Sequence, residues 1–152
     1  MFNIFNKMTN IYSPIKGVTK ELTAIDDPVF SKGLMGTTLA FVPQDNKIYA
    51  PIDGEITMVF PTLHAVGIKY NDIEILIHIG IDTVKLQGEG FKLLIKEGQK
   101  IKRGDLLMEV DFDLIREKGF QNDVIMVITQ AKKTVLNKIN EVDNEVIVGK
   151  CA

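Results

Sequence analysis

The sequence is short of several residue types. It has no tryptophan, one cysteine and two histidines among its 152 residues. A lone Cys151 excludes an internal disulfide and fits a reducing compartment. No apolar run approaches the roughly 20 residues that a membrane-spanning helix needs. No basic segment followed by an apolar one marks an N-terminal secretion signal. We therefore expect a cytoplasmic protein.

Strong charge of either sign is also lacking. Eighteen Lys and Arg face twenty Asp and Glu, a formal net charge of -2, and no basic cluster with interleaved aromatics stands out. We therefore expect no nucleic-acid partner. The length fits one domain, over residues 11–152, preceded by a loosely ordered tail over residues 1–10. Phe2, Ile4 and Phe5 allow at most peripheral membrane contact. Met1 and the tail favour a free-standing protein.

The sequence is rich in short strand-like segments. Runs of Val, Ile, Phe and Thr alternate with turn signals such as Asp53-Gly54 and Asn71-Asp72. This pattern predicts an all-β fold, an antiparallel β-sandwich with one or two short helical turns at residues 113–118 and 131–137. A faint repeat relates residues 13–17 to residues 50–54. It indicates either a duplication or common Pro-x-x-Gly turn chemistry.

One histidine lies on a predicted strand, residues 74–82. Strand alternation places four isoleucines, at 75, 77, 79 and 81, on a core face. Leu76, His78, Gly80 and Asp82 then share the other face. Gly80 has no side chain, so a bulky group could approach His78 closely.

The other histidine, His64, lies on a predicted preceding strand, residues 60–70. A three-residue loop, residues 70–72, would place His64 opposite His78 on one face. A two-residue loop would place the imidazoles on opposite faces. The sequence leaves this register open.

Three interpretations of the two histidines compete. They could be structural residues with satisfied hydrogen bonds. They could bind a metal, but a closed structural zinc site needs four ligands, so His64 and His78 would bind zinc only opportunistically and no metal is required. They could relay a phosphoryl group, because a neutral imidazole is a good nucleophile near pH 7. A neighbouring imidazole and the Thr62 hydroxyl suit that role.

The segment His78-Ile79-Gly80-Ile81-Asp82-Thr83, with the trailing Gly88-Glu89-Gly90-Phe91, resembles the active-site signature of the glucose-type EIIA proteins. These are components of the bacterial phosphoenolpyruvate:sugar phosphotransferase system. Residues 27–36, 60–65 and 97–105 are also similar to family segments. The resemblance implies a β-sandwich of the barrel-sandwich (duplicated hybrid motif) type and no cofactor.

The resemblance also implies an activity and its partners. Such proteins are phosphotransferases that accept a phosphoryl group from a histidine of HPr and pass it to a cysteine on the EIIB domain of a sugar permease. By position, His78 matches the phosphorylated histidine, attacking through Nε2, and His64 the second histidine that supports the phosphoryl group. Thr62 matches the hydroxyl that orients an imidazole, and Asp82 a carboxylate that faces HPr. An apolar ring would surround the histidines: Leu39, Phe60, Val66, Leu76 and Val84.

The sequence departs from the family at Thr37-Thr38, where an Asp-Gly pair is usual, so one acidic contact with HPr is expected to be missing. The main alternative is a regulatory binding module that inhibits or activates partner enzymes or transporters according to its phosphorylation. A biotinyl or lipoyl carrier would need a lysine at a hairpin tip, and a zinc peptidase would need further ligands; neither is found.

Overall fold

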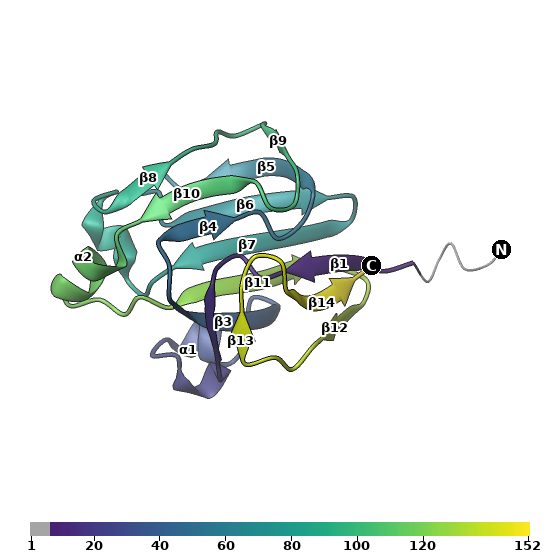
Figure 1. Cartoon of the computed structure of the whole chain (residues 1–152), viewed down its shortest axis with the longest axis horizontal. Coiled ribbons are helices and arrows are strands. Elements are labelled where there is room, and N and C mark those ends of the chain that lie inside the picture. The colour runs from purple at the N-terminus through teal and green to yellow at the C-terminus, as the bar shows by residue number, and fades with distance from the viewer. Residues whose placement is uncertain (1–6) are drawn as a thin grey trace.

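The chain is a mainly β protein in the computed structural model, which describes residues 7–152 (Figure 1). The strands are β1 (Thr9–Tyr12), β2 (Gly17–Lys20), β3 (Thr37–Pro43), β4 (Lys47–Tyr49), β5 (Gly54–Val59), β6 (Ala65–Tyr70), β7 (Ile73–Ile79), β8 (Phe91–Leu93), β9 (Lys100–Ile101), β10 (Leu106–Val110), β11 (Val124–Gln130), β12 (Thr134–Leu136), β13 (Glu141–Val142) and β14 (Ile147–Cys151). The helical turns are η2 (Leu22–Ala24), α1 (Pro28–Ser31), η3 (Thr83–Leu86) and α2 (Phe112–Glu117). Among these described residues no helix is both long and apolar enough to cross a membrane. The predicted all-β fold is confirmed.

The strands form one large sheet and two small ones. The large sheet has eight strands in the order β13-β2-β3-β11-β7-β6-β5-β9, and the small sheets have the orders β1-β14-β12 and β4-β10-β8. Figure 1 draws β4 and β10 in front of β6 and β7. One apolar core joins the two layers, since Ile48 of β4 and Leu107 of β10 are fully buried in the same cluster as Ile75 and Ile77 of β7. The result is the predicted antiparallel sandwich.

The centre of the large sheet is buried on both faces. On the core side lie Phe41, Ile77 and Met126. On the other side a smaller cluster contains Ala40, Leu76 and Ile125, packed with Phe30 of α1. Residues Val124 to Ile128 of β11 are therefore buried without alternation, as expected for a strand covered on both faces.

The structure corrects two sequence predictions. Residues 131–137 form no helical turn: Thr134 pairs with Cys151, because the backbone there completes the edge of the β1-β14-β12 sheet. Thr9 and Asn10 do not belong to a tail, because they pair with Cys151 and Lys150 in β1. The rest of the predicted tail, residues 1–6, lies outside the described residues. By contrast the turn predicted at residues 113–118 is confirmed as α2, which Asp111 caps by accepting a hydrogen bond from the Leu114 amide at 3.1 Å.

The two repeated segments contact each other reciprocally. The Tyr12 amide donates to the Pro51 carbonyl at 2.9 Å, and the Tyr49 amide donates to the Pro14 carbonyl at 2.8 Å. Each donor lies two residues before the proline of its own segment. This exchange has the twofold symmetry that a duplicated motif predicts.

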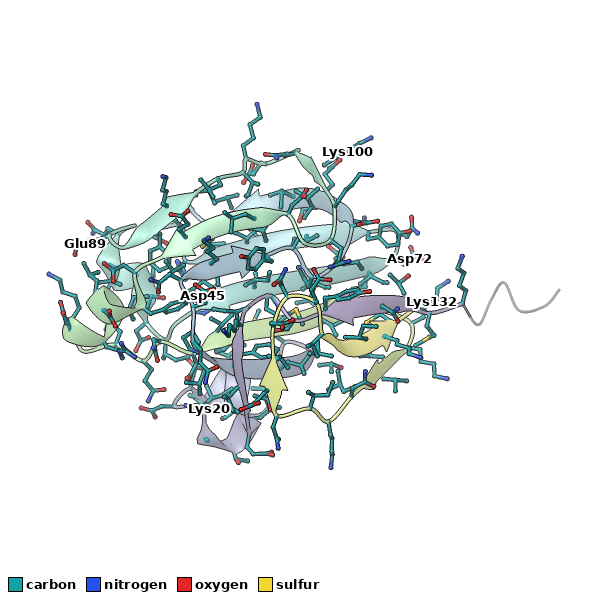
Figure 2. All side chains as sticks on the ribbon, viewed as in Figure 1. Lys20, Asp45, Asp72, Glu89, Lys100 and Lys132 are labelled. Atoms are coloured by element: carbon teal, nitrogen blue, oxygen red, sulfur yellow. The ribbon has the colours of Figure 1, made fainter. Side chains whose placement is uncertain are left out.

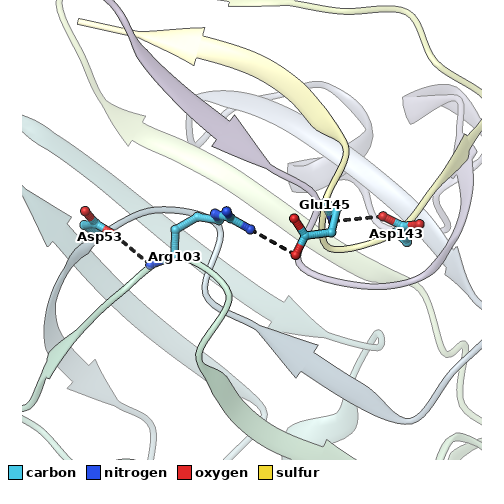
Figure 3. Close-up of polar contacts among 4 residues, drawn as sticks. All are labelled: Asp53, Arg103, Asp143 and Glu145. Carbon is cyan, nitrogen blue, oxygen red and sulfur yellow. Dashed lines mark hydrogen bonds and ion pairs between the residues drawn. The ribbon is translucent and has the colours of Figure 1, made fainter.

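Arg103, between β9 and β10, joins three distant turns (Figure 3). Its amide donates to Asp53 Oδ1 at 2.7 Å, and its guanidinium pairs with Glu145 Oε1 at 3.3 Å. The guanidinium also lies 4.1 Å from the ring centroid of Tyr12. Asp143 Oδ1 accepts from the Glu145 amide and shapes the turn that presents this carboxylate. These contacts tie β1 and the turn before β14 to the turns that flank β5 and β10.

Candidate functional site

His78 lies on β7 in the middle of the large sheet. It is paired with Ala65 of β6 on one side and Ile125 of β11 on the other. Directly opposed residues share a face, so these side chains flank the imidazole. The methyl group of Ala65 leaves space beside the ring, and the His78 side chain is half-buried. The sheet therefore holds this histidine rigidly but leaves part of it accessible.

His64 reaches the same face by an irregular turn. Tyr70 pairs with Ile73, so the β6–β7 loop has two residues. For a loop of this length the sequence predicts that the two imidazoles lie on opposite faces of the sheet. That prediction is wrong, because β6 begins at Ala65 rather than at residue 60. Leu63 has a left-handed φ of 64° and closes a turn in which the Phe60 amide donates to the Ala65 carbonyl at 3.0 Å. This turn, and not strand alternation, directs the His64 side chain.

The two imidazoles are in contact. Their ring centroids are 5.0 Å apart and the ring planes meet at 84°. Thr62 Oγ1 lies 2.7 Å from Nδ1 of His64 and holds that ring in place. Two phenylalanines pack against the pair: the Phe60 ring lies 5.2 Å from His64, and the Phe30 ring lies 4.8 Å from His78. The structure thus brings together His78, His64 and Thr62.

The nitrogens of the two rings have different surroundings. Nδ1 of His78 is buried and has no hydrogen-bond partner; it is the one side-chain nitrogen or oxygen in this condition within residues 7–152. Nδ1 of His64 is bonded to Thr62. No hydrogen bond involves either Nε2 atom within residues 7–152, and neither atom is fully buried, although the His64 residue as a whole is 4% exposed. A nucleophilic reaction at this site would therefore use Nε2.

Both imidazoles are neutral at physiological pH. Burial and, after it, the neighbouring His64 lower the pKa of His78, the Gly80 backbone, Asp27 and Asp82 raise it, and the resulting pKa is about 4. Burial also lowers the pKa of His64. A neutral imidazole has the free lone pair that a nucleophile needs.

Gly80 is required by the protein's own packing. Its φ is 72°, and a Cβ atom there would lie 2.4 Å from Thr83 Cγ2 and 2.8 Å from the Gln121 carbonyl oxygen. The prediction that Gly80 leaves space for a bulky partner is therefore wrong, because the space is already filled. Gly80 also ends the alternation of β7. Ile81 consequently joins the smaller cluster near Phe30 instead of the main core, against expectation.

The five residues of the predicted apolar ring do not lie on one face. Phe60 and Leu76 pack in the smaller cluster on the His78 face, and Val84 is 48% exposed on η3. Leu39 and Val66 are placed wrongly, because each faces the main core on the other side of the sheet. In each strand the adjacent alanine lies on the His78 face instead: Ala40 in β3 and Ala65 in β6.

Two acidic residues lie near His78, one of them not singled out from the sequence. Asp82 is exposed, with a left-handed φ of 61° at the start of η3. Asp27 caps α1 by accepting hydrogen bonds from the amides of Val29 and Phe30. This cap positions the Phe30 ring against His78. The Asp-Pro dipeptide at 27–28 is an N-cap signal that could have indicated it.

Thr37 and Thr38 lie away from the histidine pair. They pair with Ile128 and Val127, whereas His78 pairs with Ile125 of the same strand. Thr38 is buried and its hydroxyl donates to the Gly36 carbonyl at 3.0 Å. Within residues 7–152 no three His, Cys, Asp or Glu side chains gather as they would around a metal ion.

Comparison with known proteins agrees with this geometry. The family model described as phosphoenolpyruvate-dependent sugar phosphotransferase system, EIIA 1, matches residues 9–134. The solved structure of glucose permease IIA from Mycoplasma capricolum superposes with a TM-score of 0.90 and 33% identity, covering 96% of this chain and 97% of that chain. Csd3 from Helicobacter pylori matches with a TM-score of 0.43 and 16% identity, over 88% of this chain and 32% of that chain. The last likeness is too weak to support an argument.

Proposed function

This chain belongs to the EIIA 1 family of the phosphoenolpyruvate-dependent sugar phosphotransferase system, and from this membership we propose that His78 is the residue that carries the phosphoryl group. The chain is thus a phosphoryl carrier in sugar uptake. Members of this family generally take the phosphoryl group from HPr and pass it to an EIIB domain. The residues that perform the transfer, and the particular partners, are the proposal.

The contact between the two imidazoles supports this proposal most directly. The rings lie 5.0 Å apart at nearly a right angle, so a phosphoryl group on one Nε2 atom would lie beside the other ring. Three elements frame the site: β6 and β7, which pair in the large sheet, and α1, which Asp27 caps. Positioning matters because phosphoryl transfer depends on alignment and on stabilising negative oxygens.

The transfer is a displacement at phosphorus. A bond forms between phosphorus and Nε2 of His78 as the bond between phosphorus and the nitrogen of the donor histidine breaks. The bonding pair stays on the donor ring, which is protonated on its other nitrogen and leaves as a neutral imidazole. His78 enters with its proton on the buried Nδ1, because Nε2 must keep a lone pair. The product carries the phosphoryl group on Nε2 and retains the proton on Nδ1.

His64 would stabilise the transferred group. If the Thr62 hydroxyl donates its hydrogen to Nδ1 of His64, the ring keeps its own proton on Nε2. That N–H can donate to a phosphoryl oxygen on His78. The 2.7 Å contact between Thr62 and His64 fits this direction of donation as well as the reverse, and the lowered pKa of His64 keeps the ring neutral.

The surface around His78 suits partners with an apolar centre and basic residues at the edge. Val84 of η3 is an exposed apolar side chain two residues from the exposed Asp82, and Val29, exposed on α1, is next to Phe30, which packs on His78. A basic residue of HPr would face Asp82. Because phosphoenolpyruvate is a cytoplasmic metabolite, we place the relay in the cytoplasm.

Substitution of each histidine tests the proposal. His78→Ala should abolish phosphorylation in a mixture of phosphoenolpyruvate, enzyme I and HPr. His64→Ala should still accept the phosphoryl group but pass it to EIIB poorly. The measurement is acid-labile, base-stable phosphate on the protein, followed by its transfer to an EIIB domain.

Folding must be intact in both variants, which circular dichroism and thermal melting can check. Phosphate retained in His78→Ala would remove this residue as the carrier. Normal transfer to EIIB by His64→Ala would remove His64 from the mechanism.

A further inference from the structure

The first residues of β3 have a free edge. On one side β3 pairs with β11 as far as Thr37, whereas on the other side its pairing with β2 stops at Ala40. Ala40 lies opposite Lys20, the last residue of β2, which Figure 2 labels. After Lys20 the chain turns into η2 instead of continuing as a strand. Residues 37–39 therefore have a neighbouring strand on one side only.

The backbone polar groups of Thr38 point to this free edge. In an antiparallel pair, every second residue directs both its N–H and its C=O to the same neighbour. The Gln44 amide donates to the Lys16 carbonyl at 2.9 Å just beyond the β2–β3 pairing, so every second residue before Gln44, including Thr38, faces β2. No residue of β2 lies opposite Thr38, and no turn or loop within residues 7–152 bonds its backbone. Thr38 is nevertheless only 5% exposed, and a buried backbone group without a partner is costly.

A groove of about 380 Å³ lies along this edge. Residues 38–40 of β3, residues 19–22 of β2 and η2, and residues 136–140 between β12 and β13 line it. Its apolar lining comes from both sides of the sheet, since Leu22 packs on the smaller cluster while Leu39 and Ile139 pack on the main core. A strand added at this edge would place successive side chains alternately against these two clusters.

The lining of the groove fits an extended and mainly apolar peptide. Strand addition to a free edge satisfies the backbone groups, while pockets for alternate side chains give specificity. Lys20 is neutralised by Asp123, whose Oδ2 atom lies 2.9 Å from Lys20 Nζ. Lys138 and Glu21 also line the groove, have opposite charges and form no ion pair within residues 7–152. A segment without strong net charge therefore matches the groove.

The position of the groove points to the phosphoryl acceptor as the source of this peptide. Ala40 borders the groove and pairs with Ile125, which pairs with His78, so the groove begins two strand spacings, roughly 10 Å, from the imidazole. A protein docked at His78 can therefore reach it. Residues 136–140 lie beyond residues 9–134, the part that the family model matches. HPr serves the family in general, so a wall outside the shared part suits the partner that varies with the sugar, the permease.

We propose that the groove at the β3 edge binds an extended segment of the permease that carries the EIIB domain. The segment continues the sheet in the place that β2 leaves, and the Thr38 amide and carbonyl pair with its backbone. This role rests on the proposed function of His78 as the phosphoryl carrier. It gives Leu136, which lines the groove and is 41% exposed, a part in selecting the acceptor and none in the chemistry.

Hydrogen exchange tests the free edge in the chain alone. Thr38 and Ala40 are both buried, at 5% and 2% exposed, but only Ala40 has a residue of β2 opposite it. We expect the Thr38 amide to exchange on the order of tenfold faster than the Ala40 amide, measured by NMR in deuterated water. A Thr38 amide that exchanges as slowly as that of Ala40 already has a partner, and this result would overturn the proposal.

Phosphoryl transfer tests the partner. Leu136→Asn and its control Val135→Asn change neighbouring exposed residues of β12, of which only Leu136 lines the groove. The acceptors are the purified EIIB-bearing permeases of the source organism. We expect Leu136→Asn to lower kcat/KM for transfer to the permease on the order of tenfold, because it removes an apolar contact. Val135→Asn should match the parent, and both variants should accept the phosphoryl group from HPr at the parental rate.

The outcomes separate the two proposals. If HPr cannot phosphorylate the parent, or no permease accepts the group from it, the proposed function fails and this one with it. If the parent transfers the group but Leu136→Asn is no slower than Val135→Asn, the permease does not use the groove, while the carrier function stands. Should Leu136→Asn melt below the parent, Lys138→Glu decides instead, with Lys133→Glu as its control, since both lysines are exposed and only Lys138 lines the groove. Lys138→Glu leaves two carboxylates and no compensating free cation at the groove, and it should slow transfer to the permease by a similar factor.

Discussion

The side chains of His64 and His78 are held by different means. His78 is fixed by its strand, with Ala65 and Ile125 on either side. His64 follows a strained turn at Leu63 and depends on the Thr62 hydroxyl for its orientation. A ring that can rotate about its own bonds loses its tautomer preference when such a partner is removed. Loss of the Thr62 hydroxyl should therefore affect the orientation of His64 more than that of His78.

Thr62→Val removes that hydroxyl and keeps the shape of the side chain. The lost hydrogen bond is worth about 1 kcal/mol, so we expect transfer from the chain to EIIB to slow on the order of fivefold. Phosphorylation of His78 by HPr should change less. Single-turnover transfer to EIIB measures the first effect, with Thr57→Val, an exposed threonine of β5, as the control. Equal rates in the two variants would contradict a role for Thr62.

At the scale of elements, the end of β7 determines where the site forms. The strand stops at Ile79, and the left-handed turn at Gly80 leads into η3. The Thr83 hydroxyl donates to the Ile79 carbonyl and closes this turn. The turn carries Asp82 to the surface beside the histidines and sends Ile81 into the smaller cluster.

Gly80→Ala should destabilise the protein strongly. It adds both a left-handed backbone penalty and a collision with Thr83 and Gln121, so the free energy of unfolding should fall by roughly 3 kcal/mol. Gly98→Ala is the matched control: its φ is 83°, but nothing lies within 4 Å of the added Cβ. That variant should lose about 1 kcal/mol. Urea denaturation measures both, and equal losses would show that packing around Gly80 adds nothing.

At the scale of the whole molecule, stability is linked to the ionisation of the site. The pKa of His78 falls from 6.5 to about 4 on folding. Below pH 6.5 the unfolded chain therefore binds a proton that the folded chain does not. The contribution to stability is complete above pH 6.5, declines as the pH falls, and levels off below about 4. His64 acts in the same direction.

His78→Gln should flatten this pH dependence. Relative to the variant, the parent should lose on the order of 3 kcal/mol of unfolding free energy between pH 7 and pH 4. Carboxylates also titrate in this range, so the difference between parent and variant is the informative quantity. Urea denaturation at several pH values provides it. Parallel curves for the two proteins would contradict burial of a neutral His78.

The sequence by itself determined the fold class and the strand that carries His78, and it predicted the role of the imidazole. These follow from local patterns: alternation along residues 74–79, turn residues between strands, and a specific motif around the histidine. The same local patterns correctly predicted α2, which needs only its own cap and helical residues.

Only the tertiary structure decided how His64 meets His78 and which residues surround them. Alternation holds only while a strand continues, so it failed at residues 60–64, where Leu63 turns the chain, and beyond Ile79, where Gly80 does. It also misplaced Leu39 and Val66, because the phase of a strand depends on its partners. Phe30 reaches the site from an element distant in the chain. Contacts of this kind arise from sheet order and packing, which no local pattern encodes.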